Sequence, residues 1–161
     1  MDQDFHTELN IGIGKIMPLI GQVMTHARCH VSNACERLGY KLTAEEAGTL
    51  MIIYQCDGMP QSILANILGK DKASVTRVMN VLVKSGLVGR IQDEHDRRVI
   101  RAHITEEGKL AFVDILPALV GISDQALSGV SEKELHIAQK VLAQMNTNLC
   151  PRTDSSEYPC G

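Results

Sequence analysis

Polar and cationic side chains recur at helical spacing within residues 72–85. Over residues 72–85 short polar side chains and long cations share one face of a predicted helix, and apolar side chains share the other. Arginine can pair with guanine, asparagine with adenine, and lysine, serine or threonine can bind phosphate. This arrangement indicates a surface that recognises a nucleic acid. The polar face carries Lys72, Ala73, Ser74, Thr76, Arg77, Asn80 and Lys84, and the apolar face carries Val75, Val78, Met79, Leu82 and Val83.

A second basic group lies in the turn of a predicted β-hairpin. Segments 87–92 and 99–104 are predicted strands, and the polar turn between them contains Asp96, Arg97 and Arg98. Arginines on a projecting ribbon can enter a narrow minor groove, where the negative potential is strongest. A carboxylate beside them would repel phosphate unless it were paired. We therefore expect Asp96 to hold Arg98 or Arg77.

The charge of the chain is unevenly distributed. The net charge is −3, yet residues 70–103 hold eight Lys and Arg against four Asp and Glu, which is +4 and leaves −7 for the remainder. A local basic region is what steers a phosphate-binding face. Charge alone is equally compatible with an ordinary solvated surface, so the case depends on the helix and the hairpin occurring together.

Capped helices are expected to position these two groups. Thr43 and Glu46 form a predicted capping box that opens a helix ending near residue 57. A short helix over 61–68 stops at Gly69, and Asp71 caps the helix that follows. The short helix, the tight turn and the second helix must pack on each other, because neither is long enough to be stable alone.

Long helices flank this central part. Apolar residues at steps of three and four predict a helix over about 8–38, which Pro18 should kink or restart. A helix from Thr105 to about Gly129 is expected to be interrupted at Pro117, and a last helix is expected over 131–149. A small domain cannot bury such long apolar stripes by itself, so a partner chain is expected to cover them.

The stretch LTAEEAGTLMIIY…SILANILGKDKASVTRVMNVLVKSGLVGRIQDEHDRRVIRAHITEEGKLAF resembles the MarR family (multiple antibiotic resistance regulators) over about residues 42–112. Several short motifs in a fixed order carry the resemblance. They are Leu42-Thr43, Leu64-Ala65, Ser74-Val75-Thr76-Arg77, Gly86-Leu87-Val88 with Arg90, Asp96-Arg97-Arg98, and Ile104-Thr105 with Gly108.

The resemblance implies a mainly α fold with a small β-hairpin wing. It implies a winged helix-turn-helix lobe and a helical dimerisation domain built from the N- and C-terminal helices. It also places helix 72–85 in the major groove and Arg98 in the minor groove. The expected parts are an N-terminal dimerisation helix (1–40), the DNA-binding lobe (41–104), C-terminal dimerisation helices (105–149) and a disordered tail (150–161).

The expected function is sequence-specific binding of double-stranded DNA by a cytoplasmic homodimeric transcriptional regulator. Family members usually repress, and many release DNA on binding a small molecule, so an effector of unknown identity is expected in the cleft between dimer domain and lobe. A two-fold dimer would read a pseudo-palindrome with half-sites about 34–36 Å apart. No signal peptide and no long uncharged apolar run is found, so no membrane partner is expected.

Three alternatives remain open. His26, Cys29 and His30 lie within one helical turn and could bind a metal, although no metal or cofactor is the first expectation. Cys29, Cys35 and Cys56 could sense oxidants, but all five cysteines are predicted to be free thiols. The third alternative is a protein-interaction module, which would not need three arginines on one face. An enzyme is not expected, because the sequence has no phosphate loop, nucleophile elbow or HExxH motif.

Overall fold

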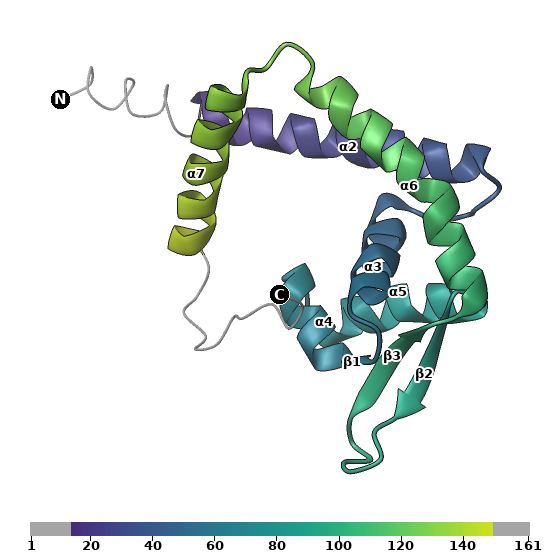
Figure 1. The fold of residues 1–161 in the computed structure, drawn as a ribbon. Coiled ribbons are helices and arrows are strands. Elements are labelled where there is room, and N and C mark those ends of the chain that lie inside the picture. Colours follow the sequence, from purple (N-terminus) through teal and green to yellow (C-terminus); the bar gives the residue numbers. More distant parts are fainter. Residues whose placement is uncertain (1–13, 150–161) are drawn as a thin grey trace. The chain divides into compact units, whose positions relative to one another are not determined.

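The computed structural model describes residues 14–149, and the chain divides into two units, Met1–Ile122 and Ser123–Gly161. Figure 1 labels the helices and shows the β-hairpin of the first unit. The expected start of the first helix near residue 8 and the expected disordered tail over 150–161 lie outside the described residues.

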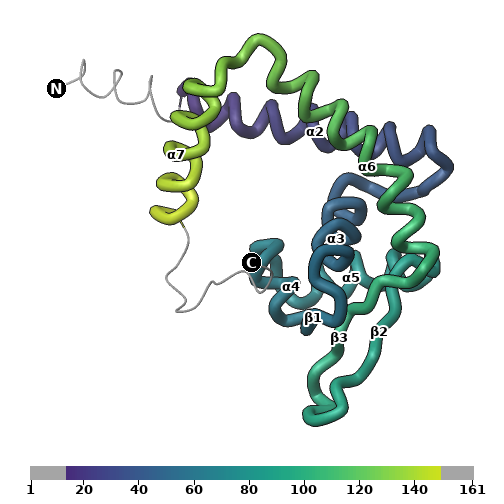
Figure 2. Tube along the Cα trace, in the orientation of Figure 1, coloured from purple at the N-terminus to yellow at the C-terminus, as the bar shows by residue number. Residues whose placement is uncertain are grey.

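Six helices and three strands follow one another along the described part of the chain (Figures 1 and 2). In order they are α2 (Met17–Arg37), α3 (Ala44–Gln55), β1 (Met59–Pro60), α4 (Gln61–Leu68), α5 (Lys72–Lys84), β2 (Val88–Gln92), β3 (Ile100–Ile104), α6 (Glu106–Leu127) and α7 (Glu132–Leu149). The expected mainly α fold with a small hairpin wing is confirmed.

The helix boundaries follow the predicted caps. The Thr43 N–H donates to Glu46 Oε2 at 2.7 Å, and the Glu46 N–H donates to Thr43 Oγ1 at 3.3 Å, so the capping box is formed. Gly69 ends α4 in the left-handed conformation with φ of 60°. Pro18 lies in the first turn of α2, where its missing N–H does not interrupt a helical hydrogen bond.

The sheet is antiparallel, in the order β1-β3-β2. Strand β3 lies at its centre and pairs with β2 over five residues, from Val88 opposite Ile104 to Gln92 opposite Ile100. Strand β1 is only two residues long and was not predicted, because Met59 and Pro60 have no alternating pattern of their own. It is a strand because Met59 pairs with Ala102 at the centre of β3.

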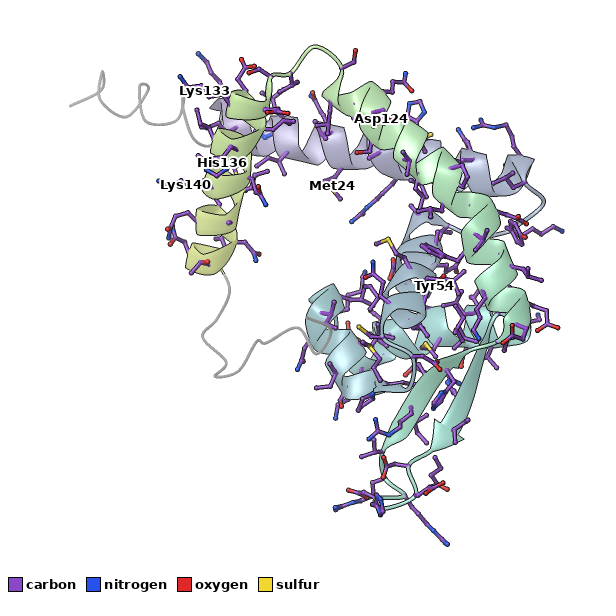
Figure 3. All side chains as sticks on the ribbon, viewed as in Figure 1. Met24, Tyr54, Asp124, Lys133, His136 and Lys140 are labelled. Atoms are coloured by element: carbon purple, nitrogen blue, oxygen red, sulfur yellow. The ribbon has the colours of Figure 1, made fainter. Side chains whose placement is uncertain are left out.

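The core of the first unit is built mainly from aliphatic side chains of α3, α4, α5 and α6. The largest fully buried side chains include Leu50, Ile53, Leu64, Met79, Leu82 and Ile115. The predicted inward face of α5 is confirmed for four residues and wrong for Val83, which is 36% exposed because one further residue turns the helix about 100° past Leu82. Tyr54 of α3, labelled in Figure 3, stacks on Phe112 of α6 with 4.4 Å between ring centroids.

Helix α6 is unbroken, so the expected interruption at Pro117 is wrong. Proline deprives only the carbonyl of Val113 of its helical donor, and the packing of Phe112 and Ile115 in the core holds the helix together across that position. By length and by a mean hydropathy of 1.5, α6 is the one helix within residues 14–149 that could cross a membrane. However, Phe112 and Ile115 are buried in the core and Asp114 accepts a hydrogen bond from the Tyr40 hydroxyl at 2.7 Å, which ties α6 to the lobe.

The second unit contains the end of α6 and helix α7. A second capping box opens α7, since the Ser131 N–H donates to Glu134 Oε2 at 2.9 Å and the Glu134 N–H donates to Ser131 Oγ at 3.4 Å. Its apolar residues Ile137, Val141 and Leu142 are exposed. Helix α7 therefore carries an apolar stripe that no other described residue of its own unit covers.

Candidate nucleic-acid interface

Helix α5 presents a polar face whose start is fixed by its cap. Asp71 accepts hydrogen bonds from the Ser74 N–H and the Ser74 hydroxyl, both at 2.9 Å. The backbone hydrogen bond from Ser74 is the main reason that the pKa of Asp71 lies below its usual value. Burial of the opposite face leaves six predicted residues exposed and Ser74 half-buried. The exposed residues are Lys72, Ala73, Thr76, Arg77, Asn80 and Lys84.

Arg77 is oriented by the same cap. One of its terminal nitrogens donates to Ser74 Oγ at 3.0 Å, so a chain of hydrogen bonds runs from Asp71 through Ser74 to Arg77. This chain limits the freedom of a long side chain before any ligand is bound. An arginine that is already ordered loses less entropy when it pairs with a base edge.

The wing carries the second basic group. Arg98 Nε donates to Asp96 Oδ1 at 3.1 Å and a terminal nitrogen donates to Asp96 Oδ2 at 3.2 Å, while the Arg98 side chain stays 91% exposed. The predicted pairing of Asp96 is confirmed for Arg98. This pair lowers the pKa of Asp96, so the carboxylate is ionised and the guanidinium is held outward. Arg97 beside it is exposed as well.

A pocket of about 230 Å³ joins the helix and the wing. Its lining comes from the start of α4, the start of α5 and the strand that leads away from the wing turn. The pocket brings Lys72 and Thr76 of α5 to the same hollow as Arg98, although these residues are more than twenty positions apart in the sequence. The lining residues are Gln61, Ser62, Lys72, Val75, Thr76, Arg98, Val99 and Ile100.

Two residues at the base of the wing were missed by the sequence reasoning. Arg101 Nε donates to Asp93 Oδ2 at 2.6 Å, and a terminal nitrogen of Arg101 donates to the Gly58 carbonyl at 2.9 Å. Asp93 Oδ1 also accepts the N–H groups of His95 and Asp96, each at 2.9 Å. The pairing therefore ties the wing turn to the loop after α3, and the pKa of Asp93 falls to about 2, chiefly through the backbone hydrogen bond from Asp96.

Replacing Asp93 by asparagine is expected to loosen the wing, because the Arg101 ion pair is lost. The carboxylate has a folded-state pKa of about 2 against an ordinary value of 3.8, so its contribution to stability is complete above 3.8 and is lost as the pH falls through 2. Trypsin should cleave after Arg97 or Arg98 faster in the variant at neutral pH, and the thermal midpoints of wild type and variant should converge on acidification.

Glu94→Gln is the matched control for this prediction. Glu94 is exposed in the same turn and its removal changes the charge by the same amount. If the two variants are cleaved at equal rates, the Asp93–Arg101 pair does not hold the wing.

Arg90 of β2 was matched to the family motif but was not placed among the predicted site residues. One terminal nitrogen donates to Asn80 Oδ1 at 2.7 Å and the other donates to the Thr76 carbonyl at 3.3 Å. The wing strand thus reaches the polar face of α5 directly. The signal available in the sequence was a cation two residues after the buried start of β2. Its partner, Asn80, lies ten residues earlier on α5, so the sequence alone did not indicate the pair.

The histidine and cysteine residues of α2 do not form a cluster. His26, Cys29 and His30 are all exposed, and within residues 14–149 no three metal-ligating side chains come together. Cys35 is buried, which raises the pKa of its thiol. The expectation that every cysteine is a free thiol is wrong for Cys56, which is disulfide-bonded. The sequence could not indicate this, because pairing depends on the approach of two Cβ atoms.

The amino-acid sequence is similar to those of known transcriptional regulators. A sequence model of the MarR family matches residues 42–100. The chain is 28% identical over 100 residues to YdgJ of Bacillus subtilis (strain 168), described as an uncharacterised HTH-type transcriptional regulator; the match covers 62% of this chain and 61% of YdgJ. The chain thus spans about three fifths of the length of this curated relative.

Solved structures share the fold. The transcriptional regulator SlyA superimposes with a TM-score of 0.78 at 23% identity, covering 84% of this chain and 94% of SlyA. MepR of S. aureus, solved in complex with DNA, superimposes with a TM-score of 0.77 at 21% identity, covering 84% of this chain and 98% of MepR. The chain is thus similar to the MarR family over its central lobe, and it shares the fold of SlyA and MepR over most of the described residues.

Proposed function

We propose that the chain is a transcriptional regulator, not an enzyme, which binds double-stranded DNA in a sequence-specific manner. The observation that carries this proposal is the joining of two cationic groups across one pocket, Lys72 on α5 and Arg98 on the wing. An α-helix fits the major groove and a wing arginine fits the adjacent minor groove. The relatives support the proposal, because YdgJ is described as a regulator and MepR was solved with DNA.

Three of the four acidic residues of this region support the same proposal. Asp71, Asp93 and Asp96 each accept hydrogen bonds from neighbouring groups of the protein. Asp71 orients Ser74, Asp93 orients Arg101, and Asp96 orients Arg98. The surplus of +4 between residues 70 and 103 is therefore available to a polyanion.

We further infer that the protein acts as a homodimer in the cytoplasm. Val113, Leu116 and Val120 form a stripe along α6 and are each at least 41% exposed. Helix α2 exposes Leu19, Val23 and Met24 in the same way. A second chain that covers these stripes would bury apolar area worth about 25 cal/mol per Å². Two lobes related by a two-fold axis would then meet a pseudo-palindromic site.

The experiment is selection of bound duplexes from a random library, followed by sedimentation of the complex. We expect an enriched pseudo-palindrome with half-sites roughly one helical turn apart, and two chains per duplex. Recovery of unrelated sequences would contradict the function, and one chain per duplex would contradict the dimer. Repeating the selection with candidate small molecules tests the expected repressor mechanism, in which an effector releases the DNA.

A thiol-redox response is a second candidate, favoured by the disulfide at Cys56. Asp57 follows it directly and accepts the Ile104 N–H at 2.8 Å, so the loop that holds the disulfide also holds β3 of the wing. Treatment with a dithiol reductant would transfer two electrons and give free thiols at this bond. We expect reduction to change DNA affinity in the wild type and to have no effect on Cys56→Ser. Equal affinities of reduced and oxidised wild type would contradict a redox response.

A further inference from the structure

Arg90 fixes the orientation of the Asn80 side chain. The amide of asparagine has an oxygen that accepts hydrogen bonds and a nitrogen that donates them, so its partner decides which of the two faces it. Arginine has donors and no acceptor, so the atom 2.7 Å from its terminal nitrogen must be the amide oxygen. The second contact of Arg90, to the Thr76 carbonyl, holds the guanidinium against α5. Asn80 is therefore held with Oδ1 toward Arg90, while Nδ2 remains available to a ligand.

The strand register makes this contact independent of flexible loops. Arg90 lies opposite Ala102 in the middle of the β2–β3 ladder, and Ala102 is fully buried. The backbone of Arg90 is thus positioned by paired strands on a packed core. Asn80 is positioned by a helix whose residues Met79 and Leu82 are also fully buried. The two side chains meet between rigid elements, which is the condition for a preorganised contact.

This orientation changes what Asn80 can read. An unrestrained asparagine pairs with adenine by accepting from the N6 amino group and donating to N7, so it needs its oxygen. Here the oxygen faces a cation, and an adenine amino group brought to it would place donor hydrogens beside a guanidinium. The major-groove edge of guanine offers two acceptors, O6 and N7. Both the amide N–H groups and the nearby positive charge of Arg90 favour such an edge.

We propose that Arg90 is a specificity-determining residue, which sets Asn80 to prefer guanine over adenine at the base that it meets. This inference rests on the proposed function, since it names the base class that the DNA-binding face reads. Arg90 acts through Asn80 and needs no base contact of its own. A purely structural role of Arg90 would change stability or overall affinity and would leave the order of preferred bases unchanged.

The test is selection from random duplexes with the wild type, Asn80→Ala, Arg90→Ala and Arg90→Lys. The position that Asn80 reads is the one whose preference disappears in Asn80→Ala. At that position we expect the wild type to favour guanine over adenine by roughly tenfold, which is the size of one good base contact. Arg90→Ala should bring the ratio to one or reverse it, because the oxygen is released. Arg90→Lys should keep a preference for guanine, because the cation remains.

The outcomes separate this inference from the proposed function. If Arg90→Ala keeps the wild-type ratio, or if Asn80→Ala changes no position, the inference is wrong while DNA recognition stands. If the wild type enriches no sequence, the proposed function fails and the inference fails with it. The ratio is insensitive to a general loss of affinity. Should Arg90→Ala not fold, Arg90→Met gives the same test, because methionine keeps an unbranched stem and has no hydrogen-bond donor for the Asn80 oxygen.

Discussion

Gly108→Ala is expected to destabilise the lobe by about 3 kcal/mol or more, at the upper end of what overpacking costs. A Cβ on residue 108 would lie 2.0 Å from the Leu87 carbonyl oxygen and 3.0 Å from its carbon. Both are backbone atoms, so no side-chain rotation can relieve the clash. The same carbonyl accepts the Thr105 N–H at 3.1 Å, and Leu87 itself is buried.

Relief of this clash requires α6 to move away from the start of β2. Thr105, which caps α6, would then lose the hydrogen bonds that it donates to the carbonyl of Gly86 at 2.7 Å and to the carbonyl of Leu87 at 3.1 Å. Thermal unfolding measures the effect, and we expect the midpoint to fall by roughly 10 °C or more.

Gly48→Ala is the control for this substitution. Gly48 also lies inside a helix of the lobe, α3, and a Cβ there meets no atom within 4 Å. Alanine favours a helix over glycine by about 1 kcal/mol, so this variant should be slightly more stable than the wild type. A Gly108→Ala protein with the stability of the wild type would show that α6 and β2 do not approach as described.

The affinity for a selected duplex is expected to fall roughly thousandfold between 50 and 200 mM salt, if each complex neutralises about six phosphates. The cations that could do so lie on α5 and the wing, and they are exposed. Each neutralised phosphate releases counterions, so the logarithm of the affinity falls linearly with the logarithm of the salt concentration. Fluorescence anisotropy over a series of salt concentrations measures this slope.

Lys72→Ala should flatten that slope by about one unit for each lobe that contacts DNA. Lysine binds phosphate as a point charge and carries little sequence information, so all duplexes should be weakened alike. Lys109→Ala is the control, because Lys109 is paired with Glu106 at 2.7 Å on α6. Equal slopes for Lys72→Ala and the wild type would refute the phosphate role of Lys72.

The parts of the fold that could be predicted depend on neighbours within about four residues. The Thr43–Glu46 box, the Asp71 cap and the pairing of Asp96 with Arg98 all join groups that close in the sequence. Their geometry is set by the local backbone, so the residue types suffice to predict them. The failure at Pro117 shows the limit of a local rule, since packing of α6 on the core holds the helix together across the lost hydrogen bond.

The sequence by itself determined the helical lobe, the hairpin and the surface on which cations gather, because periodicity and capping act locally. Only the tertiary structure decided how that surface is organised. Arg90 reaches Asn80 across ten positions and Arg101 reaches Gly58 across forty-three, through the register of β3 with its neighbours. Such contacts exist only after the core has packed and the strands have paired, so no local sequence pattern predicts them.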